Sequence, residues 1–503
     1  MLNRRRFLQF SGLAASAGAA GCVTDSRQAR RPAKAAGATA AHLGAGSPRR
    51  IIHVVSDGMS LGTLSCADQL SLLERKRHLT WIELYRRPDV TAALMDMRSL
   101  DSLVTDSAAA SSSWGSGSRV PNGVLNVNSA GDPLLPLMSL FGQAGWKRGL
   151  VTTTEITHAT PAGFTVSVSA RGEGEEIAAR YLDTRLDVLL GGARDHFDPA
   201  KRKDKRNLWA EFSWAGYHVA KTAADLEKAP TDKPWLGTFA AGHLPFTLDH
   251  RASESLRSTV PPLATLVERA LGKLGREERF LLQVEGGRVD HGCHNNDAAA
   301  ALRDQLALDE ALDVILAFQQ RHPDTLVVIT TDHGNANLGL NGMGTAYRES
   351  SQRFRNVAAV RASFPEILKA LKAAKSESES ATILADTTGY RVETKKLAEF
   401  LPFVAGKGRA LFSQMNADVA ALGQLLANHL GIGFTGTSHT SDYVPLVALG
   451  PGSERFRGIV SNTDVFRHYT DLAGIDYRNP EEPLLAASLS SAASEDIDSY
   501  ATA

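Results

Sequence analysis

The sequence predicts an α/β fold in which a mainly parallel central sheet is covered by helices on both faces. Through most of the 503 residues, short apolar runs alternate with longer helical patterns, which is the order of β-α-β units. Several of these runs end directly in an acid or a histidine, and such sheets bind ligands beyond the carboxyl ends of their strands. A composition with 43% hydrophobic residues supplies enough apolar side chains for a large buried core.

The elements follow in order from apolar spacing. Runs that predict buried strands are Ile51–Val55, Gly149–Thr153, Asp187–Leu190, Tyr217–Ala220, Phe280–Val284, Leu326–Thr331 and Val444–Leu449. Patterns that predict helices are Glu173–Leu182, Pro261–Leu274, Asp297–Gln319, Phe364–Lys375 and Leu411–Leu430. Turns are predicted at Ser376–Ser380 and Thr387–Gly389. Residues 339–431 are predicted to be a variable helical insertion, with a lid, a crown and a subunit contact as open alternatives.

The N-terminus is predicted to be a targeting segment. Residues 1–22 carry Arg4, Arg5 and Arg6 before an apolar stretch, which resembles a twin-arginine export signal. Ala19–Cys22 resembles both a lipoprotein cleavage box and an ordinary small-residue cleavage site, so lipidation of Cys22 as a membrane tether stays open. We therefore expect an exported protein in the periplasm or at the cell surface.

The remaining domain boundaries follow from composition. Residues 23–48 contain almost no large apolar side chains and are predicted to be a disordered linker. A catalytic domain is predicted over 49–480, and a loosely ordered tail over 481–503. A formal net charge of +0 gives no reason to expect nucleic acid as a partner. Three cysteines are too few for a disulfide scaffold.

The stretch Val104–Trp114 is predicted to be a tight turn that leads into a helix, with Ser107 in the first turn. Backbone N–H groups at a helix start favour an anion, and a serine there can attack a phosphorus or carbonyl centre. The alternative is an ordinary helix cap, for which serine and aspartate are both favoured. This stretch alone does not decide between them.

The segment Glu285–His294 is the densest cluster of metal-ligand residue types in the chain. If it turns helically, Asp290 and His294 lie on one face and can bind one metal. Asp57, Asp332 and His333 also follow predicted strands, so we expect all these side chains to meet at one edge of the sheet.

Six motifs in order resemble those of the alkaline phosphatases. They are DGM at 57–59, TDSAAAS at 105–111, THATPA at 157–162, EGGRVDHGCH at 285–294, TDHG at 331–334 and SHT at 438–440. The resemblance covers roughly 50–470 and is poorest between about 340 and 430. It implies the fold of that family and the hydrolysis of phosphate monoesters.

The resemblance also implies a role for each matching residue. Ser107 matches the nucleophile that becomes phosphorylated, and Arg171, eleven residues after Thr160, matches the arginine that binds phosphate. The implied cofactors are two Zn²⁺ and one Mg²⁺. Their implied ligands are Asp290, His294 and His439 for one zinc; Asp57, Asp332, His333 and Ser107 for the second; and Asp57, Thr160 and Glu285 for magnesium.

Some positions depart from the family's pattern. His158 and His291, which we also expect near the substrate, stand where the family has either a His/His or an Asp/Lys pair, so the identity of the third metal stays open. Cys293 lies inside a ligand motif, but the neighbouring ligands already match, so we interpret it as a packing residue.

Three alternatives to an exported monoesterase remain. They are a phosphodiesterase or a sulfatase-like member of the same superfamily, and a non-catalytic metal-binding surface protein. A serine in the TDSAAAS context argues against the first two, and Arg171 favours a dianionic monoester. The complete ligand set argues against the third. Because members of the family often form dimers, a homodimer is also expected.

Overall fold

The computed structural model of the protein describes residues 46–342, 344 and 346–484. The predicted export signal with Cys22, most of the predicted linker and most of the predicted tail lie outside the described residues. Within the described part of the chain, every helix is too short or too polar to cross a membrane.

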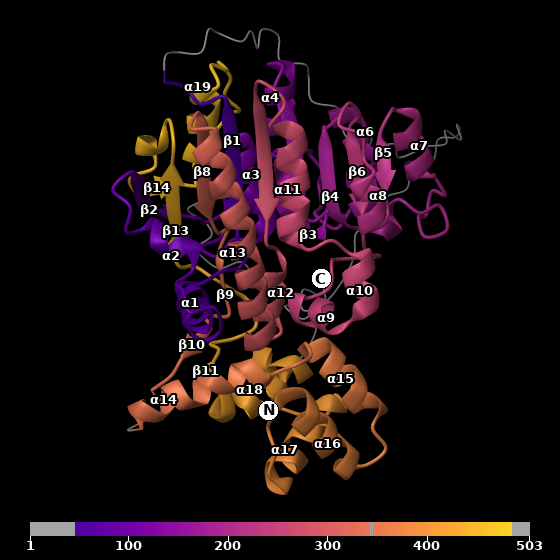
Figure 1. Ribbon diagram of the computed structural model, residues 1–503, viewed down its shortest axis with the longest axis vertical. Coiled ribbons are helices and arrows are strands. Elements are labelled where there is room, and N and C mark those ends of the chain that lie inside the picture. Colours follow the sequence, from indigo (N-terminus) through magenta and orange to yellow (C-terminus); the bar gives the residue numbers. More distant parts are fainter. Residues whose placement is uncertain (1–45, 343, 345, 485–503) are drawn as a thin grey trace, which may run out of the picture. The chain divides into compact units, whose positions relative to one another are not determined.

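A ten-stranded sheet forms the centre of the described chain (Figure 1). From one edge to the other its strands are β14 (Gly458–Ser461), β2 (Val90–Asp96), β13 (Val444–Leu449), β8 (Thr325–Thr330), β1 (Arg50–Val55), β7 (Phe280–Glu285), β3 (Lys147–Glu155), β4 (Val188–Gly192), β6 (Trp235–Thr238) and β5 (His218–Ala220). β13 is antiparallel to both of its neighbours, and the other pairs are parallel. The prediction of a mainly parallel sheet is confirmed.

Three strands of this sheet were not predicted, and each carries a weak pattern. In β2 the buried Ala93 and Met95 alternate with the exposed Ala92 and Leu94, so the exposed positions are apolar as well and the sequence shows no polar/apolar alternation. β6 and β14 are four residues each, and each contains a glycine. Short strands of this kind are held by their neighbours in the sheet rather than by their own apolar spacing.

The central strands are buried on both faces, which explains their continuous apolar runs. In β1, Ile52 and Val54 belong to the core on one face of the sheet, while Ile51 and Val55 belong to the core on the other. Successive side chains of a strand point to opposite faces, so one apolar run serves both cores.

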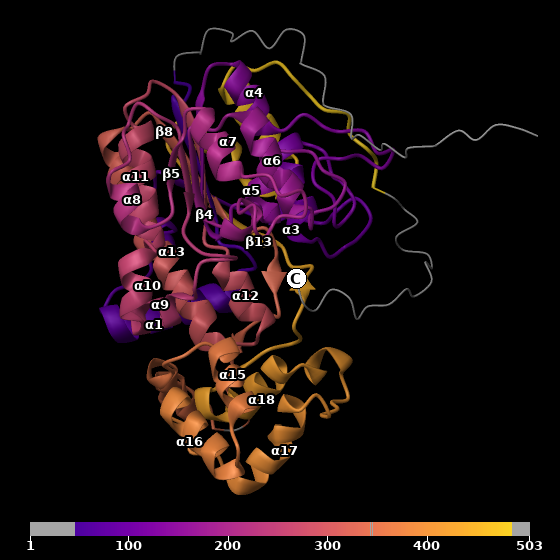
Figure 2. The same ribbon diagram turned by 90° about the vertical axis from the view of Figure 1, so that its right-hand side faces the viewer.

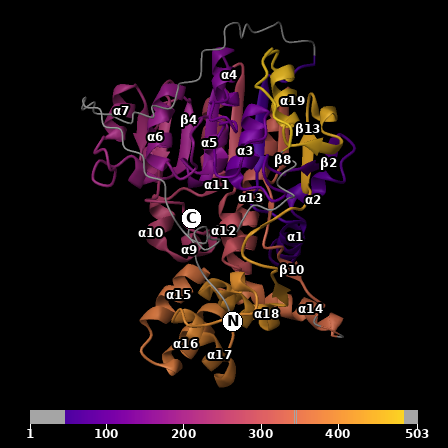
Figure 3. The same ribbon diagram turned by 180° about the vertical axis from the view of Figure 1, so that it is seen from behind.

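Two layers of helices cover the sheet, as Figure 2 shows with the sheet nearly edge-on. One layer contributes to the core around Ile52 and consists of α1 (Leu61–Arg75), α2 (Thr80–Leu84), α8 (Ala223–Glu227), α9 (Thr247–Ala252), α10 (Glu254–Thr259), α11 (Leu263–Leu274) and α13 (Ala298–Arg321). The other, facing the viewer in Figure 3, consists of α3 (Ser107–Ser116), α4 (Leu137–Gln143), α5 (Ala159–Gly163), α6 (Gly174–Thr184), α7 (Leu208–Trp214) and α19 (Asp464–Leu472).

The predicted insertion at 339–431 is helical. Its ends are joined by two short antiparallel strands, β10 (Gly339–Leu340) and β11 (Ile432–Gly433). Between them lie α14 (Tyr347–Phe354), η2 (Arg355–Ala359), α15 (Phe364–Ala373), α16 (Glu377–Thr388), α17 (Thr394–Val404), η3 (Ser413–Asn416) and α18 (Asp418–Leu430). Pairing of the two ends explains how a long segment enters and leaves the fold at one place.

The turn predicted at Ser376–Ser380 is wrong, because α16 begins there. Ser376 is the N-cap of α16, and its side chain accepts a hydrogen bond from the backbone N–H of Glu379. A polar Ser/Glu run is typical of a helix start as well as of a loop. The turn predicted at Thr387–Gly389 coincides with the end of α16, where Gly389 adopts a φ of 72°.

Small residues allow α3 to approach α5 closely. A Cβ atom at Gly115 would lie 1.9 Å from the carbonyl oxygen of Gly163, and one at Gly163 would lie 2.1 Å from Oγ of Ser111. Both positions therefore require glycine. This close contact sets the position of α3, whose first residue is Ser107.

Candidate metal centre

The predicted ligands lie at one edge of the sheet because four parallel strands end there side by side. In this register, Val55 at the end of β1 lies opposite Glu285 on β7 and Thr330 on β8. Thr152 on β3 lies opposite Glu285 on the other side. The residues at or just after these strand ends include Asp57, Thr160, Glu285, Asp332 and His333.

The first ligand group is Asp290, His294 and His439. Two of its members lie on α12 (Arg288–His294), and His439 lies on β12 (His439–Thr440), which pairs with β9 (Gly334–Asn335). Nε2 of His294 is 3.2 Å from Oδ2 of Asp290 and 3.1 Å from Nε2 of His439. Nε2 of His439 is 3.8 Å from Oδ1 of Asp290. The three predicted ligands therefore converge.

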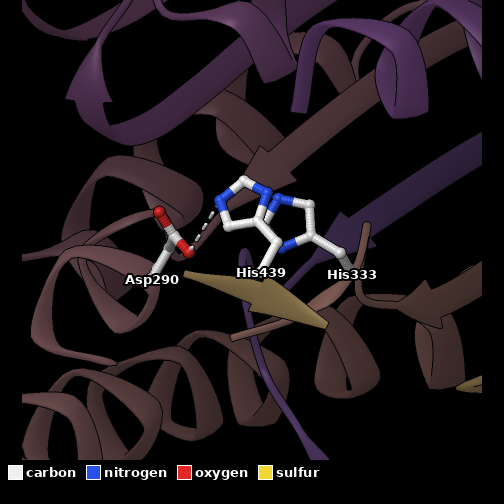
Figure 4. A group of neighbouring side chains, drawn as sticks. All are labelled: Asp290, His333 and His439. Carbon is white, nitrogen blue, oxygen red and sulfur yellow. Dashed lines mark ion pairs between the residues drawn. The ribbon is translucent and has the colours of Figure 1, made fainter. Parts of the chain in front are cut away.

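The second ligand group is Asp57, Asp332 and His333. Nε2 of His333 is 3.1 Å from Oδ2 of Asp332 and 3.7 Å from Oδ1 of Asp57. Figure 4 shows how close the first two groups are, since the rings of His333 and His439 stack with centroids 3.5 Å apart next to Asp290. Two ions held by these groups would be neighbours.

The third ligand group is Asp57, Thr160 and Glu285, and it shares Asp57 with the second. The hydroxyl of Thr160 donates to Oδ2 of Asp57 over 3.3 Å. Nδ1 of His158 is 4.0 Å from Oδ2 of Asp57 and 3.9 Å from Oε1 of Glu285. His158, predicted near the substrate, is therefore also within reach of an ion in the third group.

The donor atoms fit a metal centre. Oδ1 of Asp57 and Oε1 of Glu285 are buried and have no hydrogen-bond partner among the described residues. Buried polar atoms are normally satisfied, so a cluster of unsatisfied acceptors is a natural place for cations. Imidazole and carboxylate in the first two groups suit zinc, and the oxygen-rich third group suits magnesium.

The electrostatics of the site also favour cations. Burial raises the pKa of Asp57 well above its ordinary value, and the neighbouring carboxylates of Asp332, Asp290 and Glu285 raise it further. Burial raises the pKa of Glu285 to about 7. Burial would also raise the pKa of Asp290, but the adjacent His294 holds it well below the ordinary value. Without bound cations these buried acids repel one another.

Ser107 is the first residue of α3, as predicted, and the capping residue is its neighbour Asp106. Oδ1 of Asp106 accepts a hydrogen bond from the backbone N–H of Ala109 over 2.8 Å. Oγ of Ser107 therefore does not cap the helix, and it lies 3.2 Å from Nε2 of His333. The side chain is therefore held against the second ligand group, at the end of a helix where N–H groups favour an anion.

Arg171 is directed into the site rather than into solvent. Its Nη1 atom is 3.1 Å from Oδ2 of Asp106, and its Nη2 atom is 3.3 Å from Nε2 of His158. The backbone N–H of Arg171 donates to the carbonyl oxygen of Gly123 over 2.8 Å. Asp106 therefore connects the start of α3 to the guanidinium group.

Three histidines gather beside the third ligand group. The ring centroids of His243 and His291 are 4.4 Å apart, and that of His158 is 5.7 Å and 5.6 Å from them. The guanidinium of Arg288 is 2.8 Å from Nδ1 of His291 and can only donate, so Nδ1 accepts. Burial and then Arg288 lower the pKa of His291 well below its ordinary value.

Sequence reasoning missed several residues of this site. Asp106 and Arg288 lie inside two of the six motifs, next to Ser107 and near Asp290 in the sequence. Their positions could therefore have predicted that they belong to the site. His243 belongs to a loop after β6, inside the segment WLGTFAAGHLPF at 235–246, which also resembles the family but was not given a role. Asn335 donates to Oδ1 of Asp290 over 2.6 Å, a contact that depends on how two distant segments meet.

Cys293 is fully buried, and its Sγ atom is 3.8 Å from Oγ1 of Thr63. Burial raises the pKa of the thiol to about 12. A thiol that stays protonated is a poor metal ligand, and this agrees with the interpretation of Cys293 as a packing residue.

Comparisons with known proteins point to one family. The family model described as alkaline phosphatase matches residues 48–475. The chain is 31% identical over 370 residues to alkaline phosphatase 4 of Bacillus subtilis, covering 72% of this chain and 75% of that protein. It is 27% identical over 488 residues to the streptomycin-6-phosphate phosphatase of Streptomyces griseus, covering 88% and 94%. The solved structure of Thermus thermophilus alkaline phosphatase superposes with a TM-score of 0.82 and 34% identity, covering 87% of this chain and 93% of that one.

Proposed function

The chain belongs to the alkaline phosphatase family and is a phosphoric monoester hydrolase, and we propose that it is exported and works through a phosphoserine at Ser107. In this proposal two zinc ions occupy the first and second ligand groups, and a magnesium ion occupies the third. Phosphate monoesters are its substrates, as the family implies.

One observation carries the proposal: Asp106, the sequence neighbour of Ser107, binds Arg171. The expected nucleophile and the expected phosphate-binding side chain are therefore brought together. Oγ of Ser107 adjoins His333 of the second ligand group at 3.2 Å. The carboxylate of Asp106 holds the guanidinium of Arg171 at 3.1 Å. A nucleophile at a metal group and a guanidinium fork beside it are the parts that phosphoryl transfer needs.

The reaction would proceed as two in-line displacements. Oγ of Ser107 attacks the phosphorus, the bond from phosphorus to the leaving oxygen breaks, and the proton lost from the hydroxyl of Ser107 ends on that leaving oxygen, so that an alcohol departs. Water then attacks the phosphoserine from the vacated side, and Oγ of Ser107 leaves with a proton. Arg171 donates two hydrogen bonds to phosphate oxygens through both steps. The ammonium group of lysine does not reproduce this paired geometry. Two displacements by this route are each easier than one direct attack.

Ions held by the three ligand groups would supply positive charge near the reacting oxygens and would polarise water. The side chains arrange that chemistry. Asp57 belongs to two ligand groups, so it couples the position of the serine to that of the third group. Asp106, the neighbour of Ser107, holds the guanidinium of Arg171 by an ion pair. The neutral ring of His291 is left with its proton on Nε2, because Nδ1 accepts from Arg288.

Export is supported by Arg4 and Arg5 before an apolar stretch in residues 1–22. Lipidation of Cys22 and formation of a homodimer stay predictions. Fractionation of cells checks this part of the proposal, because activity confined to the cytoplasm would contradict export.

The enzymatic proposal is tested with purified protein, a chromogenic phosphate monoester, the matching diester and the matching sulfate ester. We expect the monoester to be hydrolysed faster, the activity to disappear after a chelator has removed the metals, and zinc with magnesium to restore it. Faster hydrolysis of the diester would favour the phosphodiesterase alternative, and a sulfate ester as the best substrate would favour a sulfatase-like enzyme. No turnover in any sample would favour the non-catalytic alternative.

Arg171→Ala should lower kcat/KM for the monoester by about 100-fold, because two charge-assisted hydrogen bonds are lost. Arg171→Lys should recover only part of this, since an ammonium group cannot fork two oxygens. The control is Arg86→Ala, just after the end of α2, which removes an exposed arginine paired with Glu83. Steady-state kinetics decide, and full activity of Arg171→Lys would contradict the assigned role.

A further inference from the structure

The insertion at 339–431 approaches the metal centre through Gln414, which lies in η3. Oε1 of Gln414 accepts a hydrogen bond from the backbone N–H of Thr437 over 3.1 Å. Thr437 stands two residues before the ligand His439. The insertion, which sequence reasoning left without chemistry, therefore contacts the loop that carries a ligand of the first group.

The same peptide segment contacts a second ligand. The carbonyl oxygen of Thr437 is 2.6 Å from Nδ1 of His294. A carbonyl oxygen can only accept, so Nδ1 of His294 carries a proton and Nε2 keeps its lone pair for a metal. Thr437 thus receives a hydrogen bond from His294 on one side and donates one to Gln414 on the other.

The amide of Gln414 packs tightly against the loop that contains Gly436 and Thr437. A Cβ atom at Gly436 would lie 2.5 Å from Oε1 of Gln414, so the amide rests against the loop backbone. Asn296 also donates to the carbonyl oxygen of Gly436 over 2.8 Å when its amide nitrogen faces that oxygen. Gly436 is buried and contacts both amides. These contacts hold the backbone from which both His294 and His439 are oriented.

We propose that Gln414 is a positioning residue for the first ligand group, and that the insertion controls how tightly zinc is held there. The proposal rests on the proposed function in one respect, which is that zinc occupies this group. Without an acceptor at position 414, the N–H of Thr437 donates to water instead, and the loop loses the hydrogen bond that connects it to η3. The carbonyl of Thr437 then holds the ring of His294 less firmly. Removing a direct partner of a metal ligand typically changes metal affinity 10–100-fold, so we expect the lower end of that range for Gln414, which acts through Thr437.

The test compares three variants of the full-length protein. Gln414→Leu keeps the size of the side chain but removes the acceptor, and Gln414→Glu keeps an acceptor for the N–H of Thr437. Gln424→Leu, at an exposed position on α18, is the matched control. Zinc affinity is measured by competition with a chelating dye, and thermal unfolding of the metal-free proteins is measured in parallel.

We expect Gln414→Leu to weaken the binding of one zinc ion about tenfold, with metal-free stability unchanged. Gln414→Glu should bind zinc at least as well as wild type, and the control should equal wild type. Wild-type zinc affinity in Gln414→Leu would overturn the inference. So would a weakened affinity that Gln414→Glu does not restore, or one that accompanies an equal loss of metal-free stability. Failure of the wild type itself to bind zinc would instead count against the proposed function.

Discussion

Replacing Ser107 by alanine is expected to lower kcat for a phosphate monoester by about 10⁴-fold or more, because the double-displacement route is lost. Oγ of Ser107 is nearly fully buried and lies 3.2 Å from Nε2 of His333. Substrate can still bind through Arg171, so KM should change far less than kcat. Acid quenching with a labelled substrate provides a second readout, since wild type should retain label on the protein and the variant should not.

A matched control lies in the same helix. Ser113 is buried and donates to the carbonyl oxygen of Ala109, far enough along α3 to leave the ligand groups alone. Ser113→Ala should therefore keep near-normal kcat. If Ser107→Ala retained wild-type turnover while Ser113→Ala behaved normally, Ser107 would not be the nucleophile.

Asp57→Asn is expected to lower kcat/KM about 10³-fold, because one carboxylate serves both the second and the third ligand groups. Oδ1 of Asp57 lies 3.7 Å from Nε2 of His333, and Oδ2 accepts from Thr160. Asparagine keeps the shape but removes the charge. Elemental analysis after gel filtration should find less metal bound in both groups, whereas a loss confined to one group would contradict the sharing of Asp57.

The same variant should be more stable than wild type when both are free of metal. Burial, with the neighbouring carboxylates, raises the pKa of Asp57 in the folded state well above its value of 3.8. The folded protein therefore binds the proton more tightly than the unfolded chain, and ionised Asp57 costs stability as the pH rises above 3.8. Urea unfolding should show that the advantage of Asp57→Asn grows with pH and levels off once Asp57 is ionised in the folded protein.

Asp309→Asn separates a general effect of buried acids from an effect of the metal centre. Asp309 is buried on α13 and pairs with Arg75, and burial raises its pKa to about 6. Its replacement should leave metal content and kcat/KM close to wild type. A drop in activity as large as that of Asp57→Asn would mean that buried charge, and not the ligand position, is responsible.

Much of the fold was predictable because local patterns report burial. β1, β7 and β8 are short apolar runs buried on both faces, and each ends next to a ligand residue. α16 shows the limit of such reasoning, since its Ser/Glu start matches a turn as well as a helix. In that segment Leu384, buried in the core, contributes the packing that a local pattern does not reveal.

The candidate site was predictable in residue type but not in mutual contact. The predicted helix start and the resemblance named Ser107, and the resemblance alone named Arg171. Neither revealed that Asp106 joins them, because a carboxylate that caps a helix and pairs with a guanidinium looks the same in sequence as one that only caps. His243 was missed for a similar reason, since its neighbours come from other strands.

By itself, the sequence determined which chemical groups this protein carries and that most of them follow buried strands. Only the tertiary structure decided that β8, β1, β7 and β3 lie side by side, so that ligands more than two hundred residues apart in the chain share one edge. It also decided that Gln414 of the insertion contacts the loop of His439 through Thr437. The physical reason is that strand order and loop contacts arise from long-range packing of two cores, whereas the period of a strand or helix is a local property of the chain.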